Sequence, residues 1–487
     1  MNKPIRTMSV FCLFLFLALL LNVTWVQYIK AGEYNDSGLN ARVKDETLSR
    51  ERGAILVAGR PVAESRPSDD RYKFQRVYPY RPYLYAPLTG YFALARSTLL
   101  ENSQNKLLSG DDDRLFVNRL VDLVNNASPK GGNVSLTIDP AAQRAAYDGL
   151  AALGDNVQGG AVAIEPSTGK VLAMVSLPSF NPNKFADHDT AAVDAYDKAM
   201  QTRADKPLQS RATKIRLSPG SVFKLVTAAA AIESEGYDAE SLVPGGPSYK
   251  LPGTNISINN GGRSCGSNQI PLTQALEQSC NTTFLALANQ VGHEKMLEQA
   301  EKFGFNNGNL LRDFAESEQS ASSYPTGDIS DDFLAKTGMG QQDVQATPLQ
   351  MAMVVAGIVN DGVVMRPYLV DQVRSPDLDV LETAEQEEFS RAISPSTASE
   401  LRKMMVNTVD RGTASVAQIP GVRVGAKTGT AENCAGCQNY SWFVSYASEG
   451  GQEVAVAVMV QKSNASVVSG SGQAGPIARA IMDAVIK

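Results

Sequence analysis

The tetrapeptide Ala-Lys-Thr-Gly occurs twice in this chain, with its lysine at Lys336 and again at Lys427. A cation followed by a hydroxyl and a glycine can bind a carboxylate. The first copy runs into GMGQQDVQATPLQMAM, where a helix capped near Thr347 is expected. We therefore predict that the first copy is a structural turn.

The second copy, residues 427–429, lies between VRVGA and TAENCAGCQNYSWFVSYA, a pattern typical of an edge hairpin. A free strand edge offers backbone N–H and C=O groups to an extended peptide. Gly429 allows close approach, Lys427 supplies a cation, and Thr428 and Thr430 supply hydroxyls. The second copy is predicted to bind a peptide carboxylate and the oxyanion of acyl transfer.

Three Ser-x-x-Lys matches could supply a serine nucleophile, at residues 103–106, 167–170 and 221–224. The first lies in a polar stretch and the second in a hairpin turn. The third opens an apolar helix, for which Ser218 is the expected N-cap and Pro219 the first helical residue.

In that arrangement Ser221 lies in the first helical turn, where the helix dipole favours developing negative charge, and Lys224 follows on the same face. Burial lowers the pKa of the Lys224 amine, and a second cation nearby lowers it further. Neutral Lys224 can then serve as the base for Ser221.

Among the Ser-x-Asn matches, SCN at residues 279–281 stands out because it interrupts a helical pattern between QALEQ and TTFLALA. The others, SQN, SFN and SIN, are read as loops or turns. We expect Ser279 and Asn281 to point into a cleft.

Other chemistries fit poorly. GSGQAG at residues 470–475 resembles a dinucleotide-binding turn, but no second strand follows and no acidic residue lies about 20 positions further on, so a flexible turn is expected. His188 and His293 are the only histidines and are expected to be solvated, and there is no Gly-x-Ser-x-Gly elbow. The net charge of −6, without a basic block, argues against nucleic-acid binding.

The N-terminus predicts a membrane anchor. Residues 9–27, SVFCLFLFLALLLNVTWVQ, are uncharged and long enough for one spanning helix. Lys3 and Arg6 precede it and Trp25 and Tyr28 end it, which places the short tail in the cytoplasm and the bulk of the chain outside. The alternative is a cleaved signal peptide, but no clear cleavage site follows.

The later elements indicate an α+β fold. Residues 52–65 and 160–179 read as hairpins, and Asp139 and Pro140 are expected to cap and begin a helix over residues 140–153. Many helices follow, then three strands and a final helix. This segregation predicts an antiparallel sheet flanked by helices.

Four cysteines fall outside the predicted anchor, where disulfides persist. They allow three pairings, of which we expect Cys265–Cys280 and Cys434–Cys437. No second Cys-x-x-Cys completes a zinc site, so no metal is expected.

SVFK, SCN and KTG, in that order, form the motif set of β-lactamases and penicillin-binding proteins. With RGAILVAG, LTIDPAAQ and SWFVSYA, the chain resembles a class B penicillin-binding protein, most like the A-type elongation proteins of actinobacteria. The resemblance implies an anchor at residues 1–30, a β-rich extended pedestal at 31–158, and a transpeptidase domain with a five-stranded antiparallel sheet at 159–487.

The resemblance also implies roles. Ser221 would attack the penultimate D-Ala carbonyl of a peptidoglycan stem peptide, with Lys224 as base. Ser279 would pass the proton to the leaving D-Ala, and Lys427 would tune the charge. β-Lactams would acylate Ser221, and no cofactor is needed.

In the same family, Asn281 would bind the peptide amide, while Thr428 and Thr430 would hold the terminal carboxylate. The backbone N–H groups of Ser221 and Thr430 would form the oxyanion hole. The pedestal would dock a membrane glycan polymerase of the SEDS type.

Two departures from the patterns of related enzymes narrow the choice of activity. Cys280 stands where β-lactamases usually have Asp, and no Glu-x-x-Leu-Asn element is visible, which argues against a lactamase. The 128 residues of segment 31–158 are too few for a glycosyltransferase domain. The alternatives are a D,D-carboxypeptidase and a β-lactam sensor or scaffold with the same fold.

Overall fold

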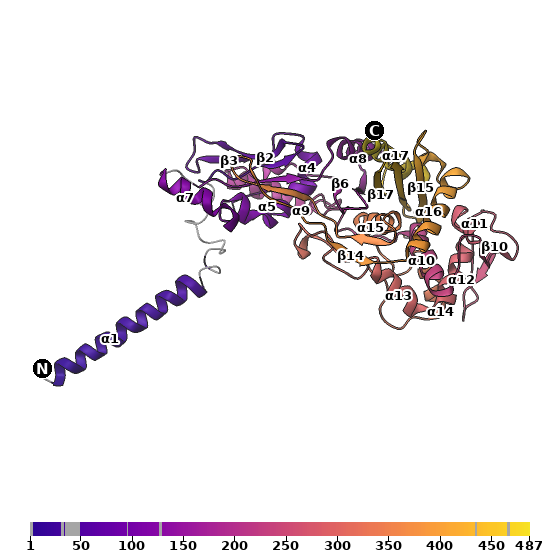
Figure 1. The fold of residues 1–487 in the computed structure, drawn as a ribbon, viewed down its shortest axis with the longest axis horizontal. Coiled ribbons are helices and arrows are strands. Elements are labelled where there is room, and N and C mark those ends of the chain that lie inside the picture. Colours follow the sequence, from indigo (N-terminus) through magenta and orange to yellow (C-terminus); the bar gives the residue numbers. More distant parts are fainter. Residues whose placement is uncertain are drawn as a thin grey trace.

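The computed structural model describes residues 3–30, 34, 49–94, 96–125, 129–433, 436–464 and 468–487. An apolar helix, α1 (Lys3–Thr24), continues as a π-helical turn, η1 (Trp25–Ile29), and buries none of its residues. Together they form the one described helix that is long and apolar enough to cross a membrane. The segments expected to form the pedestal and the transpeptidase domain lie beyond it along the long axis of the molecule (Figure 1).

The pedestal is built on a six-stranded sheet in the order β13-β12-β4-β1-β2-β3. The predicted first hairpin is present. The strands are β1 (Ile55–Val57), β2 (Arg60–Pro67), β3 (Phe74–Val77), β4 (Asn133–Leu136), β12 (Val370–Arg374) and β13 (Val380–Thr383).

Two of these strands come from far along the chain, within the segment that the sequence placed in the transpeptidase domain. β12 pairs antiparallel with β4, so that Val373 lies opposite Val134. A pairing across more than 200 positions leaves no local pattern, so the sequence did not indicate it. The pedestal and the later domain therefore share a sheet.

The pedestal sheet is accompanied by short helices and a buried charge cluster. Glu101 accepts hydrogen bonds from Arg52 Nε and Arg76 Nε, each at 2.7 Å, and from Tyr78 OH at 3.1 Å. All four side chains are buried. The helices are α4 (Pro82–Thr89), α5 (Leu99–Ser103), α6 (Asn105–Leu108), η2 (Asp113–Leu115) and α7 (Phe116–Val124).

The segment expected to form the transpeptidase domain contains the predicted five-stranded sheet, in the order β15-β16-β17-β5-β6 and antiparallel throughout. Its strands are β5 (Gln158–Ile164), β6 (Val171–Leu177), β15 (Arg423–Ala431), β16 (Tyr440–Glu449) and β17 (Gln452–Lys462). The fold-class prediction is confirmed.

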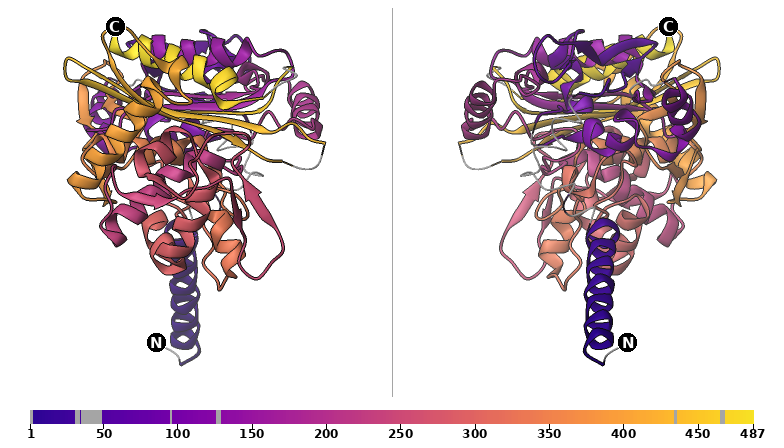
Figure 2. Two further views of the ribbon diagram at one scale, coloured as in Figure 1. Left: turned by 90° about the vertical axis from the view of Figure 1, so that its right-hand side faces the viewer. Right: turned by 90° about the vertical axis from the view of Figure 1, so that its left-hand side faces the viewer.

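Both faces of this sheet are buried. Along β17, Val456 and Val458 pack with the cluster that includes α8 (Pro140–Ala151) and α17 (Gly475–Ile486), whereas Ala457 and Met459 pack with the main core. Figure 2 shows yellow α17 on one face and the pink and orange helices on the other. This explains the near-continuous apolar runs of the strands.

The remaining elements complete the fold around these two sheets. They are η3 (Pro182–Lys184), α9 (Thr190–Thr202), η4 (Gly220–Phe223), α10 (Lys224–Glu235), β7 (Leu242–Pro244), β8 (Ser248–Lys250), β9 (Ser257–Asn259), β10 (Gln269–Pro271), α11 (Leu272–Glu277), α12 (Asn281–Val291), α13 (His293–Lys302), η5 (Glu316–Glu318), α14 (Asp331–Thr337), α15 (Pro348–Val359), β11 (Val363–Met365), β14 (Glu388–Arg391), α16 (Pro395–Asp410), η6 (Ser415–Ala417) and η7 (Gly470–Ala474).

Candidate active site

Ser221 lies in a 3₁₀ turn, η4, that leads directly into α10. The prediction that Ser218 caps an α-helix starting at Pro219 is wrong: the side chain of Ser218 caps nothing, and the α-helix begins only at Lys224. Tertiary contacts reshape this stretch. Gly220 has a positive φ of 55° and donates its N–H to Gly340 O at 2.9 Å, while Ser218 O accepts from the indole of Trp442 at 3.0 Å.

Ser279 occupies the predicted break between two helices, α11 and α12. Its φ of 57° is left-handed, a conformation that costs a non-glycine residue about 1–2 kcal/mol. The side chain is fully buried. Its neighbour Cys280 is joined to Cys265, one of the two expected bridges, with Cα atoms 5.8 Å apart. The break aims the Ser279 hydroxyl at two lysines.

The first of these lysines is Lys224, which is fully buried at the start of α10. Its Nζ donates to Ser279 O at 2.9 Å and to Asn281 Oδ1 at 2.8 Å, and lies 3.4 Å from Ser279 Oγ. Burial, and then repulsion by Lys427 and by Arg263, holds the pKa of Lys224 well below its ordinary value. A neutral amine uses two N–H groups for the two acceptors and keeps its lone pair for a hydroxyl proton.

The second is Lys427, also fully buried, on the edge strand β15. Its Nζ donates to Ser279 Oγ at 2.8 Å and to Thr428 O at 3.0 Å. Burial, and then repulsion by Arg263, lowers its pKa. Ser279 Oγ accepts from both lysines, so its own proton is free for a third group.

Arg263 is a member of the site that sequence reasoning missed. Its Nη1 donates to Ser279 O at 3.3 Å, and its charge repels both lysines. A signal was present in the sequence. Arg263 lies two residues before Cys265, and the expected Cys265–Cys280 bridge brings it next to Ser279.

Strand β15 places the second Ala-Lys-Thr-Gly copy beside η4, the turn that contains Ser221 (the serine turn). β15 pairs with β16 on one side only. A Cβ on Gly429 would lie 3.0 Å from Pro219 O and from Val222 Cγ1, so the glycine permits this approach. Thr428 Oγ1 lies 2.9 Å from Thr413 Oγ1, and Thr430 is exposed.

GSGQAG, expected to be a flexible turn, forms the π-helical turn η7 behind this strand. A Cβ on Gly470 would lie 2.7 Å from Gly429 O and 2.3 Å from Trp442 O. The glycine is therefore required for packing.

The first Ala-Lys-Thr-Gly copy is elsewhere and is structural, as predicted, but it is the end of a helix, α14, where a turn was expected. Lys336 pairs with Asp332 one turn earlier at 3.5 Å. Thr337 is buried and donates to Leu334 O at 2.7 Å. The next helix is capped by Thr347, as predicted.

The remaining predicted residues fall outside this cluster. Cys434 lies outside the described residues, so the Cys434–Cys437 bridge stays a prediction. The two histidines are half-buried, where solvated side chains were expected: His188 pairs with Asp70, and His293 stacks on the ring of Tyr324.

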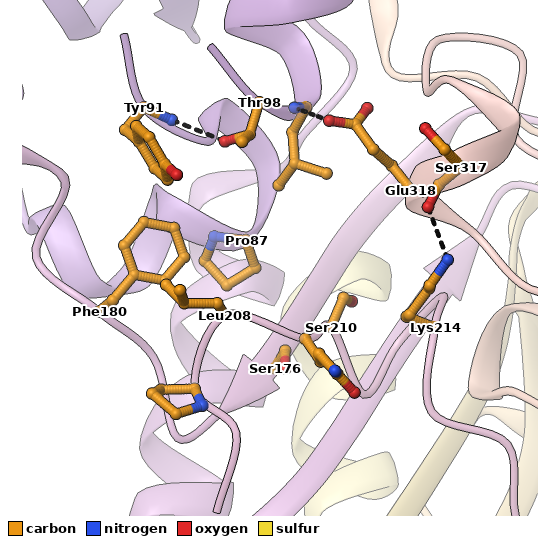
Figure 3. A pocket seen from close by; sticks show the side chains of 13 residues that line it. Pro87, Tyr91, Thr98, Ser176, Phe180, Leu208, Ser210, Lys214, Ser317 and Glu318 are labelled. Atoms are coloured by element: carbon orange, nitrogen blue, oxygen red, sulfur yellow. Dashed lines mark hydrogen bonds between the residues drawn. The ribbon is translucent and has the colours of Figure 1, made fainter. Parts of the chain in front are cut away.

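A separate cavity of about 190 Å³ is shown in Figure 3. It is lined by pedestal residues such as Pro87 and Tyr91 and by Phe180, Leu208 and Lys214 of the later domain. None of the predicted site residues lines it, so the serine–lysine cluster is distinct from this cavity.

Comparison with known proteins identifies the architecture. Residues 159–483 match the family described as penicillin binding protein transpeptidase domain, and residues 52–134 match penicillin binding protein A dimerisation domain. This chain belongs to the penicillin-binding protein transpeptidase family. Within the class B penicillin-binding proteins, it resembles the peptidoglycan D,D-transpeptidase PbpA of Mycolicibacterium smegmatis. The two are 38% identical over 100% of this chain and 99% of the relative.

Further relatives of this penicillin-binding protein include PbpA of Mycobacterium tuberculosis, at 36% identity over 100% of this chain and 99% of the relative. The fold superposes on penicillin-binding protein A of M. tuberculosis in its ceftriaxone acyl-enzyme complex. That match has a TM-score of 0.85 and 36% identity, and covers 91% of this chain and 100% of that chain. The penicillin G acyl-enzyme complex matches with a TM-score of 0.82 and 37% identity, over 90% of this chain and 100% of that chain.

Proposed function

We propose that this chain is a serine-type D,D-transpeptidase that cross-links peptidoglycan stem peptides through an acyl-enzyme on Ser221, and that β-lactams acylate the same residue. The observation that carries this is the buried chain of contacts from Lys427 through Ser279 Oγ to Lys224. The names of the full-length relatives and their β-lactam acyl-enzyme complexes support the same activity.

Acylation begins with a proton transfer. Neutral Lys224 accepts the Ser221 hydroxyl proton while Ser221 Oγ bonds to the carbonyl carbon of the penultimate D-Ala. The carbonyl oxygen becomes an oxyanion, and the backbone N–H groups of Ser221 and Thr430 stabilise it, each by roughly 3–4 kcal/mol. The N-terminus of α10, which follows the serine turn directly, adds a favourable dipole.

Collapse of this intermediate breaks the peptide bond. The proton held by Lys224 passes through the Ser279 hydroxyl to the leaving D-Ala nitrogen, with Lys427 keeping the Ser279 oxygen oriented. Free D-Ala departs, and the ester on Ser221 remains. In the second half, the amine of another stem peptide attacks the ester and restores the Ser221 hydroxyl.

Substrate binding uses the edge of β15. The stem peptide extends along this strand, its amide contacts Asn281, and its terminal carboxylate binds Thr428 and Thr430 beside Lys427. Gly429 allows the backbone of the peptide to lie close to the strand. No group of this mechanism requires a metal or organic cofactor.

The chain is proposed to be divided into an anchor (1–30), a pedestal (31–158, extended by β12 and β13) and a transpeptidase domain (159–487). α1 supports a single-pass location in the cell membrane with the catalytic domain outside the cytoplasm. The pedestal is proposed to dock a membrane glycan polymerase of the SEDS type, which co-purification from membranes would test. Absence of any polymerase from the complex would refute that partner.

The test of the nucleophile is labelling of the purified protein with a fluorescent penicillin. Covalent label on the parent and none on Ser221→Ala places the acyl group on Ser221. Ser103→Ala and Ser167→Ala, in the other two Ser-x-x-Lys matches, are the controls and should label like the parent. Label retained on Ser221→Ala would overturn the proposal.

A second assay separates transpeptidase from carboxypeptidase. Given a stem peptide ending in D-Ala-D-Ala together with an amine acceptor, a transpeptidase forms the cross-linked product as it releases D-Ala. Release of D-Ala with only hydrolysed peptide would make the chain a carboxypeptidase.

A further inference from the structure

Helix α7 (Phe116–Val124) presents its apolar side to solvent and its polar side to the protein. It has no buried residue. Its three polar side chains, Asn118, Arg119 and Asp122, are the half-buried ones. All six apolar side chains are exposed: Phe116 57%, Val117 69%, Leu120 46%, Val121 53%, Leu123 75% and Val124 85%.

The helical geometry explains this inversion. At 100° per residue the six apolar side chains occupy one continuous arc of roughly 160°, and the three polar side chains occupy the rest. On the protein side, Arg119 contacts Asp113 at 3.7 Å and Gly110 O at 3.4 Å. An apolar stripe this wide normally packs on a core, and here nothing in the described chain covers it.

The position of α7 in the fold indicates what covers its apolar face. The helix lies at the tip of the pedestal, at the end away from the transpeptidase domain (Figure 1). The segments that precede and follow α7 both make contacts with the stretch through which the chain enters the pedestal. On one side Gly53 donates to Leu108 O and Arg50 pairs with Asp111; on the other, Gly131 donates to Glu51 O.

That stretch follows the apolar helix closely. Only 19 residues, 30–48, separate Ile29 from Ser49, a span of at most about 70 Å. The tip that carries α7 is therefore tethered to the anchor. Charged residues near the start of α7 are already in ion pairs, Arg114 with Asp112 and Arg50 with Asp111. The exposed face of α7 therefore offers apolar contact to a partner, not charge attraction.

We propose that α7 is an interfacial helix whose apolar face inserts into the outer surface of the lipid bilayer. A helix with one apolar and one polar face lies in the plane of the membrane interface. Two contacts, the spanning helix and α7, then orient the pedestal on the membrane. This goes beyond the proposed activity but rests on the proposed anchor.

The experiment uses the full chain reconstituted in phosphatidylcholine nanodiscs at one copy per disc. Cys12→Ser removes the one described free thiol, and Leu123→Cys carries an environment-sensitive fluorophore. Asn118→Cys, on the polar side of the same helix, is the matched control. Nitroxide-bearing lipids should quench the label at position 123 at least about fivefold more than the label at 118.

Added Val121→Glu should remove most of the quenching at position 123, while fluorescent penicillin still labels the protein, which shows that it is folded. Equal quenching at positions 118 and 123 would overturn the interfacial role alone. If the label at position 123 were shielded from solvent only in discs that hold two copies of the chain, the apolar face of α7 would be a contact with a second copy. That result would also overturn the interfacial role. A chain that stays out of the discs would overturn both the anchor and α7.

Discussion

The two Ala-Lys-Thr-Gly copies have the same four residues and different chemistry. In the first, Lys336 is at the end of α14, where it is partly exposed and pairs with Asp332. In the second, Lys427 is on β15, fully buried, with its amine 2.8 Å from Ser279 Oγ. Burial, and then the charge of Arg263, lowers the pKa of Lys427.

The threonines and glycines differ in the same way. Thr337 directs its hydroxyl into its own helix, toward Leu334 O. Thr428 stands on a strand that is unpaired on one side. Gly338 makes room for Phe284 O, whereas Gly429 makes room for the serine turn. A motif of this length therefore acquires a function only from the elements that meet it.

The largest difference is expected between the two lysines. Lys427→Ala should lower the rate of β-lactam acylation by about 10²–10³, because it removes an oriented donor from a buried site. Lys336→Ala, which removes a partly exposed charge, should leave the rate within about twofold. Both rates come from time courses with fluorescent penicillin. Equal losses would contradict the distinction between the copies.

The glycines should separate stability from activity. In Gly338→Ala the new Cβ would lie 2.3 Å from Phe284 O and 2.6 Å from Ala288 Cβ, so we expect the free energy of unfolding to fall by about 1–3 kcal/mol. Gly429→Ala, with contacts at 3.0 Å, should lower acylation about tenfold or more by displacing the serine turn. Urea unfolding and acylation rates measured on both variants test the pair. The reverse pattern would refute it.

The charge beside the second copy should control the pH dependence. In the proposed mechanism only neutral Lys224 is a base, so acylation should rise as pH rises through its pKa. Arg263→Gln removes a repelling charge and should raise the pKa of Lys224. The increase in acylation rate then moves to higher pH, and acylation becomes several-fold slower at pH values below that pKa. Arg263→Lys keeps the charge and should keep the profile. Acylation rates between pH 5 and 9 measure this, and an unmoved midpoint in Arg263→Gln would contradict it.

The smallest effect belongs to the ion pair of the first copy. Asp332→Asn removes the partner of Lys336, and we expect no measurable loss of unfolding free energy, because a partly exposed i,i+4 pair is screened by water. The acylation rate should not change. Chemical denaturation resolves this. A clear fall in the denaturant midpoint of Asp332→Asn would show that the first copy is more than a helix end.

Some elements follow directly from local sequence. Asp139 caps α8 and Pro140 is its first residue, as the residues predicted, because a cap is decided within one turn. The same reasoning failed at Ser218 and Pro219, where bonds to Gly340 and Trp442 override the local preference. Local signals hold where no distant group competes.

The sequence by itself determined the apolar helix, the antiparallel sheet, and the serine, lysine and Ala-Lys-Thr-Gly residues of the site. Periodicity and residue type act over a few positions and are therefore readable along the chain. Tertiary structure alone decided that β12 and β13 complete the pedestal sheet, that Arg263 faces the lysines, and that α7 turns its apolar side outward. Each of these depends on contacts between segments far apart in the chain, which no local pattern encodes.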